Sequence, residues 1–310
     1  MTHDCLLKFM FDHTPVRGEV VSLQTPWRHI VGLHDFAPRV REVLGEMLAA
    51  SALLSSTLKF EGALVMQLQG DGPVKLLVAE CHADLGMRAT AKVVGDAPIP
   101  DDLPLQQLLN PNGGARMAIT LDPRDRQPGQ QPYQGIVPVE GDSVAAMLEN
   151  YMLRSEQIET RLWLASDAQG AAGLLMQRMP STGGHAVVPT GDDDTWARTV
   201  HLSETIQRAE LLALAPETIV RRLFWQEEHA RLFEPRTARF ACSCSREKVG
   251  NMLLTLGREE VDSVIEELGE VNVHCEYCNA AYRFDRVDVG QLFASSGPAT
   301  GTAEPDRRQH

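Results

Sequence analysis

Four cysteines in two short pairs place the strongest constraint on how this chain can fold. Cys242 and Cys244 form a C-x-C pair, Cys275 and Cys278 form a C-x-x-C pair, and thirty residues separate the two pairs. Thiolate is a soft ligand that suits zinc, and four thiolates complete a tetrahedral shell around it. We therefore predict that the C-terminal part of the chain folds around one Zn²⁺ ion held by these four side chains.

The residues between the two pairs are expected to fold and to bring the second pair back to the first. Helical patterns cover residues 248–256 and 258–268, Gly257 separates them, and Gly269 follows the second. Glycine is the residue that most often terminates a helix. His274 lies next to Cys275, but alternation along a strand points its side chain to the opposite face, so we do not expect it to be a ligand.

A site closed by four thiolates leaves no position for water or substrate, which disfavours hydrolytic zinc catalysis. Two interpretations stay open on the residues alone. The zinc site either holds a small domain together as a structural ribbon, or it acts as a redox switch. In the second case an oxidant pairs the cysteines and the metal is released, and a domain whose folding depends on zinc then unfolds.

The first part of the chain, residues 1–185, reads as an α+β core domain. A chain of 310 residues with 43% hydrophobic content favours more than one domain. Helices are predicted from Pro38 and from about Ser143. Strands are predicted at 16–23, 63–69, 74–80, 87–94, 116–121, 133–139, 159–165 and 172–179.

Two segments of this core share one order of elements. In each, a strand precedes a helix, and two strands joined by a glycine-containing turn follow it; the turns are residues 69–72 and 167–170. We interpret this as a candidate internal duplication of a strand–helix–strand–strand unit.

Residues 186–236 are predicted to form a helical linker. A helical stretch follows residue 192, with Ser203 as a candidate N-terminal cap, and Pro216 opens a second helix. The stretch is amphipathic and acidic. It packs on the core as a helical hairpin, or it is a conditionally exposed protein-binding surface, and periodicity does not separate the two. A zinc-binding domain is expected at 237–293 and a disordered tail at 294–310.

Charge and hydropathy exclude several classes of function. The formal net charge is −13, and residues 236–290 hold seven basic against ten acidic residues. Nucleic-acid binding depends on clustered Lys and Arg, so we expect no nucleic-acid partner. No run of about eighteen apolar residues suggests a membrane span. No secretory signal is visible, so we expect a cytoplasmic protein, whose thiols are kept reduced.

The core contains no recognisable catalytic motif. We find no phosphate-binding glycine loop, no G-x-S-x-G and no H-E-x-x-H, and His29, His34, Asp35 and His82 have no catalytic spacing. We therefore expect a protein that is not an enzyme. Cys5 and Cys81 lie outside the cysteine pairs and are expected to be ordinary thiols, although Cys81 beside His82 is a candidate for an adventitious disulfide.

Residues 240–249, 256–260 and 273–279, together with Leu223-Phe224, closely resemble the 33-kilodalton heat-shock protein family of redox-regulated chaperones. The C-x-C and C-x-x-C spacing is the hallmark of that family, and the resemblance spans nearly the whole chain. It implies an ATP-independent holdase that is inactive when reduced and zinc-bound.

The same resemblance implies the order of events and the partners. Cys275 and Cys278 would form a disulfide under peroxide, Cys242 and Cys244 would pair next, zinc would be released, and the linker would loosen to expose apolar surface. Unfolding client proteins and a homodimeric active form are implied as partners. For the client-binding surface we predict the linker side chains Leu212, Leu223, Phe224 and Trp225. The alternative is an enzyme or interaction protein with a purely structural zinc ribbon.

Overall fold

A computed structural model describes residues 3–58, 61–95, 97–125, 131–179, 192–226 and 230–295. The chain divides into two compact units, Met1–Cys242 and Ser243–His310. The first contains two six-stranded sheets with helices, and the second contains a small two-stranded sheet with helices. This confirms the predicted α+β class. In the described parts of the chain no helix is long and apolar enough to cross a membrane.

The first sheet, called sheet A, has the strand order β10-β1-β2-β9-β8, and β11 also pairs with β1. Its strands are β1 (Cys5–Phe11), β2 (Val16–Leu23), β8 (Glu159–Ser166), β9 (Ala171–Arg178), β10 (Ala230–Leu232) and β11 (Arg236–Thr237). Strand β1 was not predicted from the sequence, because its seven residues are almost uniformly apolar and buried and show no alternation.

The second sheet, called sheet B, has the order β12-β5-β4-β3-β6-β7. Its strands are β3 (Gly62–Gln69), β4 (Val74–His82), β5 (Gly86–Val93), β6 (Arg116–Pro123), β7 (Tyr133–Pro138) and β12 (Arg239–Phe240). All neighbours pair antiparallel except β12, which runs parallel to β5. The predicted strands of the core are thus all present.

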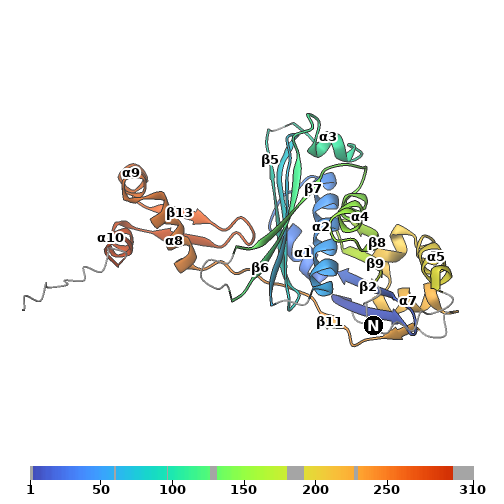
Figure 1. Ribbon diagram of the computed structural model, residues 1–310. Coiled ribbons are helices and arrows are strands. Elements are labelled where there is room, and N and C mark those ends of the chain that lie inside the picture. The colour runs from blue at the N-terminus through green and yellow to red at the C-terminus, as the bar shows by residue number, and fades with distance from the viewer. Residues whose placement is uncertain are drawn as a thin grey trace, which may run out of the picture. The chain divides into compact units, whose positions relative to one another are not determined.

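A long helix, α2 (Pro38–Thr57), lies between the two sheets and contacts both (Figure 1). Pro38 occupies its first turn, where its missing N–H costs no hydrogen bond. Gly45 allows a close approach, because a Cβ there would lie 2.0 Å from Oγ of Ser166 and 3.0 Å from the ring of Trp27. Trp27 comes from α1 (Thr25–Gly32) and donates its indole N–H to the carbonyl of Asp167 at 2.7 Å. The main core therefore forms around one helix shared by two sheets.

The remaining helices of the core are α3 (Leu105–Leu109) and α4 (Val144–Arg154). Ser143 caps α4 by accepting the backbone N–H of Ala146. Each strand–helix–strand–strand segment is present: β2 in sheet A leads through α2 to β3 and β4 in sheet B, and β7 in sheet B leads through α4 to β8 and β9 in sheet A. The order of elements is confirmed, and their origin by duplication stays a prediction.

Three linker helices follow: α5 (Asp192–Ser203), α6 (Arg208–Ala213) and α7 (Pro216–Phe224). The prediction that Ser203 caps a helix at its N-terminus is wrong. Ser203 is the last residue of α5 and is buried, and its hydroxyl donates to the carbonyl of Thr199. Gln207 instead forms the capping box of α6 with Glu210. The helix start that Pro216 predicts is confirmed.

The linker helices cover one face of sheet A, which we call the platform. The platform consists of the buried side chains Leu7, Phe9, Phe11, Val16, Val20, Ala165, Ala172, Leu174 and Met176. Leu211 of α6 and Ile219, Val220, Leu223 and Phe224 of α7 pack onto it. The linker therefore belongs to the same compact unit as the core, and its role as a separately unfolding segment stays a prediction.

The second unit contains α8 (Arg246–Leu256), α9 (Arg258–Leu268), β13 (Val271–His274), β14 (Ala281–Phe284) and α10 (Arg286–Ser295). Gly257 and Gly269 both have positive φ angles and end the first two helices, which confirms their predicted limits. Leu253, Val261, Ile265, Val271, Phe284 and Val289 form its small core. Most of the predicted disordered tail, from residue 296, lies outside the described residues, as do residues 180–191 between core and linker.

Candidate functional site

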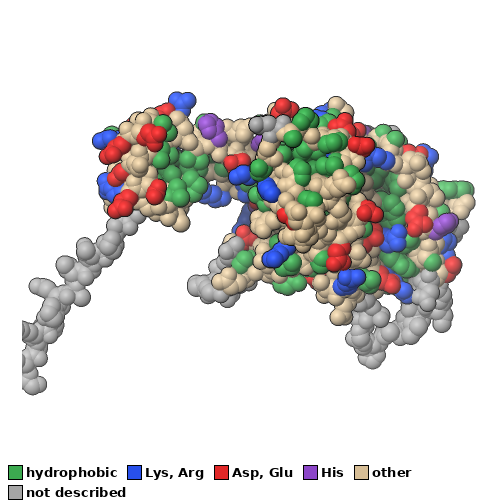
Figure 2. Space-filling view, turned by 90° about the horizontal axis from the view of Figure 1, so that it is seen from above, with side chains coloured by type: hydrophobic (Ala, Val, Ile, Leu, Met, Phe, Trp, Pro, Cys, Tyr) green, Lys and Arg blue, Asp and Glu red, His purple; other side chains and the backbone are tan. Residues whose placement is uncertain are grey.

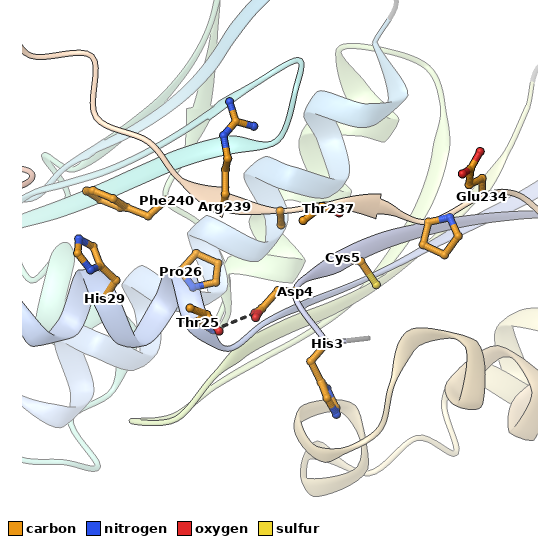
Figure 3. Close-up of a pocket in the computed structure, with 12 residues that line it drawn as sticks. His3, Asp4, Cys5, Thr25, Pro26, His29, Glu234, Thr237, Arg239 and Phe240 are labelled. Carbon is orange, nitrogen blue, oxygen red and sulfur yellow. Dashed lines mark hydrogen bonds between the residues drawn. The ribbon is translucent and has the colours of Figure 1, made fainter. Parts of the chain in front are cut away.

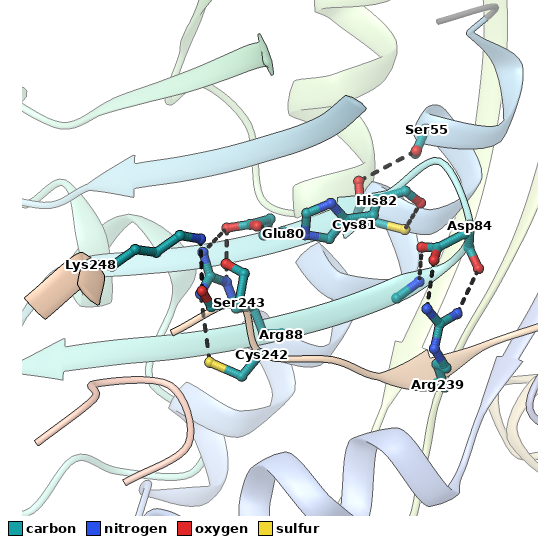
Figure 4. A network of polar contacts seen from close by, with 11 residues as sticks. Ser55, Glu80, Cys81, His82, Asp84, Arg88, Arg239, Cys242, Ser243 and Lys248 are labelled. Atoms are coloured by element: carbon teal, nitrogen blue, oxygen red, sulfur yellow. Dashed lines mark hydrogen bonds and ion pairs between the residues drawn. The ribbon is translucent and has the colours of Figure 1, made fainter. Parts of the chain in front are cut away.

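The C-x-C pair lies between a strand and a helix. Cys242 follows β12, and α8 begins at Arg246, where the Ser245 hydroxyl accepts the backbone N–H of Lys248. The ammonium group of Lys248 also donates to the carbonyl of Ser243 at 2.7 Å (Figure 4). The helix cap and this lysine together fix the backbone between the two sulfurs.

The C-x-x-C pair lies in the tight turn that joins β13 to β14. The N–H of Cys275 donates to the carbonyl of Ala280, and the N–H of Asn279 donates back to the carbonyl of Cys275. Asn279 has a φ of 54°, in the left-handed region that asparagine tolerates better than most residues. The turn thereby places the sulfurs of Cys275 and Cys278 together.

The structure brings all four predicted ligands into one cluster. The four sulfur atoms lie within 4.8 Å of one another, and those of Cys244 and Cys278 are 3.4 Å apart. A tetrahedral zinc site with Zn–S bonds of about 2.3 Å requires sulfur atoms about 3.8 Å apart. The cluster therefore suits a metal ion of that size, and all four side chains are half-buried. His274 is exposed and lies outside the cluster.

A phenol stands against one of the sulfurs. The Tyr282 hydroxyl, from β14, donates to Sγ of Cys244 at 3.0 Å. This hydrogen bond is the largest cause that raises the pKa of Tyr282 to about 12, so the phenol keeps its proton and stays a donor at neutral pH. Donors to sulfur orient metal ligands and stabilise the thiolate form.

The core supplies a second donor, to Cys242. Nη1 of Arg88, on β5, lies 3.6 Å from Sγ of Cys242. Arg88 is held in turn by two hydrogen bonds to Oε2 of Glu80, and His82 contacts the other oxygen of Glu80 at 2.9 Å (Figure 4). Burial opposes ionisation of Glu80, but the hydrogen bonds from His82 and Arg88 outweigh it and lower the Glu80 pKa. An ionised Glu80 therefore fixes Arg88 beside the first cysteine, a contact that nothing in the sequence pattern predicted.

The two other cysteines are placed for packing. Cys5 and Cys81 are both buried, and burial raises the pKa of the Cys81 thiol to about 12. A thiol that does not ionise is a poor nucleophile. The expectation that both are ordinary thiols agrees with this environment, and a disulfide through Cys81 is disfavoured because its side chain is fully buried.

The predicted client-binding side chains occupy different environments. Leu223 and Phe224 are buried against the platform, Leu212 packs partly against it, and Trp225 is 74% exposed. Sequence periodicity identified these residues as apolar but did not identify the platform beneath them. Whether any of the four contacts a client stays a prediction.

Known proteins resemble the chain along most of its length. The family model described as "Hsp33 protein" matches residues 4–285. A 33 kDa chaperonin of Methylobacillus flagellatus is 49% identical over 293 residues, covering 94% of this chain and 95% of the relative. One of Chromobacterium violaceum is 47% identical over 292 residues, covering 94% of each chain. The chain belongs to the Hsp33 family.

A solved structure supports the Hsp33 fold. The 33 kDa chaperonin of Thermotoga maritima superimposes with a TM-score of 0.77 at 21% identity, covering 94% of this chain and 99% of that one. The resemblance expected from the cysteine motifs is thus confirmed. Membership of an Hsp33 chaperonin family places the chain among chaperones rather than enzymes, so the enzyme alternative is wrong. Client proteins are the partners that such a family implies.

Proposed function

We propose that this protein is an ATP-independent holdase that is inactive with a reduced, zinc-loaded cluster and is activated by oxidation. The observation that carries the proposal is the arrangement of the chain before the cluster. The linker helices cover an apolar platform on sheet A, and the chain then reaches Cys242 through the three short strands β10, β11 and β12. The state of the cysteines can therefore determine whether the platform stays covered.

Cys242, Cys244, Cys275 and Cys278 are the proposed ligands of one Zn²⁺ ion. When bound, zinc would keep the four sulfurs as thiolates and would stabilise the fold of the small second unit. Tyr282 and Arg88 donate to Cys244 and Cys242 and orient them for this role. That unit has only six buried apolar side chains among its described residues, so its fold is expected to depend on the cluster.

The proposed switch oxidises the two pairs separately. Two thiolates of one pair lose two electrons and form an S–S bond, while one hydrogen peroxide molecule takes up these electrons and two protons and becomes two water molecules. The resemblance favours Cys275 with Cys278 first and Cys242 with Cys244 second. A disulfide offers no thiolate ligand, so oxidation of both pairs leaves the metal without its shell.

Loss of the cluster is proposed to free the linker and uncover the platform. The exposed apolar face would then bind unfolding proteins, which present apolar side chains of their own. The activated form is proposed to be a homodimer. A broad nucleic-acid surface finds no support: the formal net charge is −13, and on the face seen in Figure 2 Lys and Arg side chains are interspersed with Asp and Glu side chains.

The test uses the full chain, reduced and loaded with zinc. Peroxide is added at mild heat, zinc release is followed with a chromogenic chelator, and aggregation of a chemically denatured protein is measured by light scattering without ATP. We expect suppression only after zinc release. If zinc is released and no suppression appears, the cluster is structural and the protein is an interaction protein of another kind.

A further inference from the structure

The segment of residues 230–241, which we call the strap, is the last part of the first unit before Cys242. Its strands β10 and β11 pair antiparallel with β1, for example Leu232 with Phe9 and Thr237 with Cys5. Its strand β12 pairs parallel with β5, with Arg239 opposite Gly86 and Phe240 opposite Met87. One short segment thus covers the outer edges of β1 in sheet A and β5 in sheet B.

Backbone hydrogen bonds hold the strap on both edges. On β1, the N–H of Phe233 donates to the carbonyl of Lys8, and Ala238 N–H donates to the carbonyl of Asp4 at 2.9 Å. On β5, the N–H of Arg239 donates to the carbonyl of Leu85 at 3.1 Å, and that of Ala241 donates to the carbonyl of Met87 at 2.9 Å. These bonds use only main-chain groups of the strap, so any extended chain can form them.

Arg231, Leu232 and Arg236 anchor the first part of the strap, through Asp12, the platform and the carbonyl of Ala83, but few side chains anchor the end next to Cys242. Ala238 is buried, and the ring of Phe240 packs against His29 with the two centroids 4.3 Å apart. Figure 3 shows Phe240 and His29 facing one another at a cavity of about 760 Å³ between the strap, β1 and α1. Arg239, between Ala238 and Phe240, forms an exposed ion pair with Asp84 at 2.5 Å. Exposed ion pairs contribute little to stability, which makes this part of the strap replaceable.

The strap continues directly into the cysteine cluster. Arg88 of β5 donates to the sulfur of Cys242, one residue beyond the strap, so the same sheet edge holds both. A strap that loses the constraint at Cys242 is held at that end by its backbone bonds to Leu85 and Met87 and by the Arg239 contacts. Detachment would leave unpaired main-chain groups along β1 and β5, and such edges readily accept another strand.

We propose that the edges of β1 and β5 which the strap vacates after oxidation are a second client-binding site, for extended segments of unfolded polypeptide. The inference rests on the proposed oxidative activation. The strap itself shows the side-chain preference: a small residue at the position of Ala238, a basic one opposite Asp84, and an aromatic one against His29. Main-chain pairing also explains why the site distinguishes unfolded from folded proteins, since folded proteins have few free main-chain donors.

The test uses a synthetic peptide with the sequence of residues 234–241, labelled at its N-terminus, and the oxidised full chain. We expect it to bind, to protect amides of β1 and β5 in hydrogen exchange, and to weaken aggregation suppression. The matched control peptide carries N-methyl groups at Ala238, Arg239 and Ala241, which removes three donors and keeps every side chain. It should bind at least tenfold more weakly.

A charge exchange at the exposed Asp84 tests the predicted preference, and Asp84→Asn is its control, because the Asp84 side chain also accepts the backbone N–H of Gly86 at 3.0 Å. Asp84→Lys in the protein should lower affinity for the native peptide and raise affinity for a peptide carrying Arg239→Glu. Equal binding of native and N-methylated peptides, or no protection of either edge, would overturn the inference.

The outcomes also separate this inference from the proposed function. If the oxidised protein suppresses aggregation strongly and saturating strap peptide does not weaken this, the proposed holdase function is supported and the edge site is wrong. If the oxidised protein does not suppress aggregation, the proposed holdase function is wrong. The edge site is then wrong as well, unless labelled denatured client still competes with the peptide for binding. If a higher protein concentration displaces the peptide but client does not, the edges of one copy bind the strap of another copy. The assignment of the site to clients is then wrong.

Discussion

Replacement of Phe224 by alanine should uncover the platform without any oxidant. Phe224 is 2% exposed, and its ring lies 5.4 Å from that of Phe9 and 5.2 Å from that of Phe11, measured between centroids. Truncation of a buried phenylalanine costs about 3–5 kcal/mol, including its aromatic contacts. If α7 detaches together with the rest of the linker, a loss of about 3 kcal/mol of packing free energy raises the detached fraction roughly 100-fold.

Hydrogen exchange of the reduced, zinc-loaded protein measures this fraction directly. We expect amides of α5, α6 and α7 to exchange about 100-fold faster in Phe224→Ala, while those of β3, β4 and β6 in sheet B change little. Aggregation suppression should appear in the reduced state. Trp225→Ala is the matched control, because the adjacent aromatic side chain is 74% exposed and its loss should change stability by less than about 0.5 kcal/mol.

Two results would refute this reasoning. If both substitutions leave linker exchange equally unchanged, the contact with Phe9 and Phe11 does not hold the linker. If linker and sheet B amides accelerate together, the linker does not open separately from the core, and the proposed release mechanism loses its basis.

Three further predictions concern the cluster and the linker contacts. Cys275→Ser or Cys278→Ser should weaken zinc binding in chelator competition and increase linker exchange without oxidant; unchanged linker protection would show that the cluster and the linker are not coupled. Arg88→Gln should weaken zinc retention by about 10- to 100-fold, the usual effect of losing a hydrogen bond to a metal ligand. Arg88→Lys keeps a cation beside Glu80 and should weaken zinc retention less. Identical rates of zinc transfer to a chelator in the two variants and the unmodified protein would contradict this. Burial, followed by the nearby Glu42, raises the pKa of Glu46 to about 7, against the attraction of Arg208 and Arg39. Folding therefore takes up a proton between about pH 4.5 and 7, so the free energy of unfolding should rise as the pH falls through that window, by about 3 kcal/mol at most. Glu46→Gln should flatten that part of the pH profile in urea titrations, and a profile that keeps its slope would show another group to be responsible.

The sequence predicts what is decided locally. The C-x-C and C-x-x-C pairs, the glycines at 257 and 269 and the proline at 216 each act within a few residues, and the structure places them as expected. The prediction of Ser203 as a helix cap was wrong because a serine inside a helix can also donate its hydroxyl to a carbonyl one turn earlier.

Contacts between distant residues were not predictable in the same way. Strand β12 has two residues and exists because β5 offers an edge, more than 150 positions earlier in the chain. The contact between Arg88 and Cys242 has the same origin. The platform was missed for a related reason, since most of its side chains come from strands whose alternation does not reveal which face the linker covers.

The close approach at Gly45 also predicts how such chains can diverge. Because α2 serves both sheets, a side chain at residue 45 would have to be accommodated by Ser166 of β8 and Trp27 of α1 at once. Single substitutions at these three places should be tolerated poorly, and compensated changes should arise together. Comparison of many related sequences should therefore show residues 27, 45 and 166 varying as a group, while the exposed strap residues 234 and 237 drift independently.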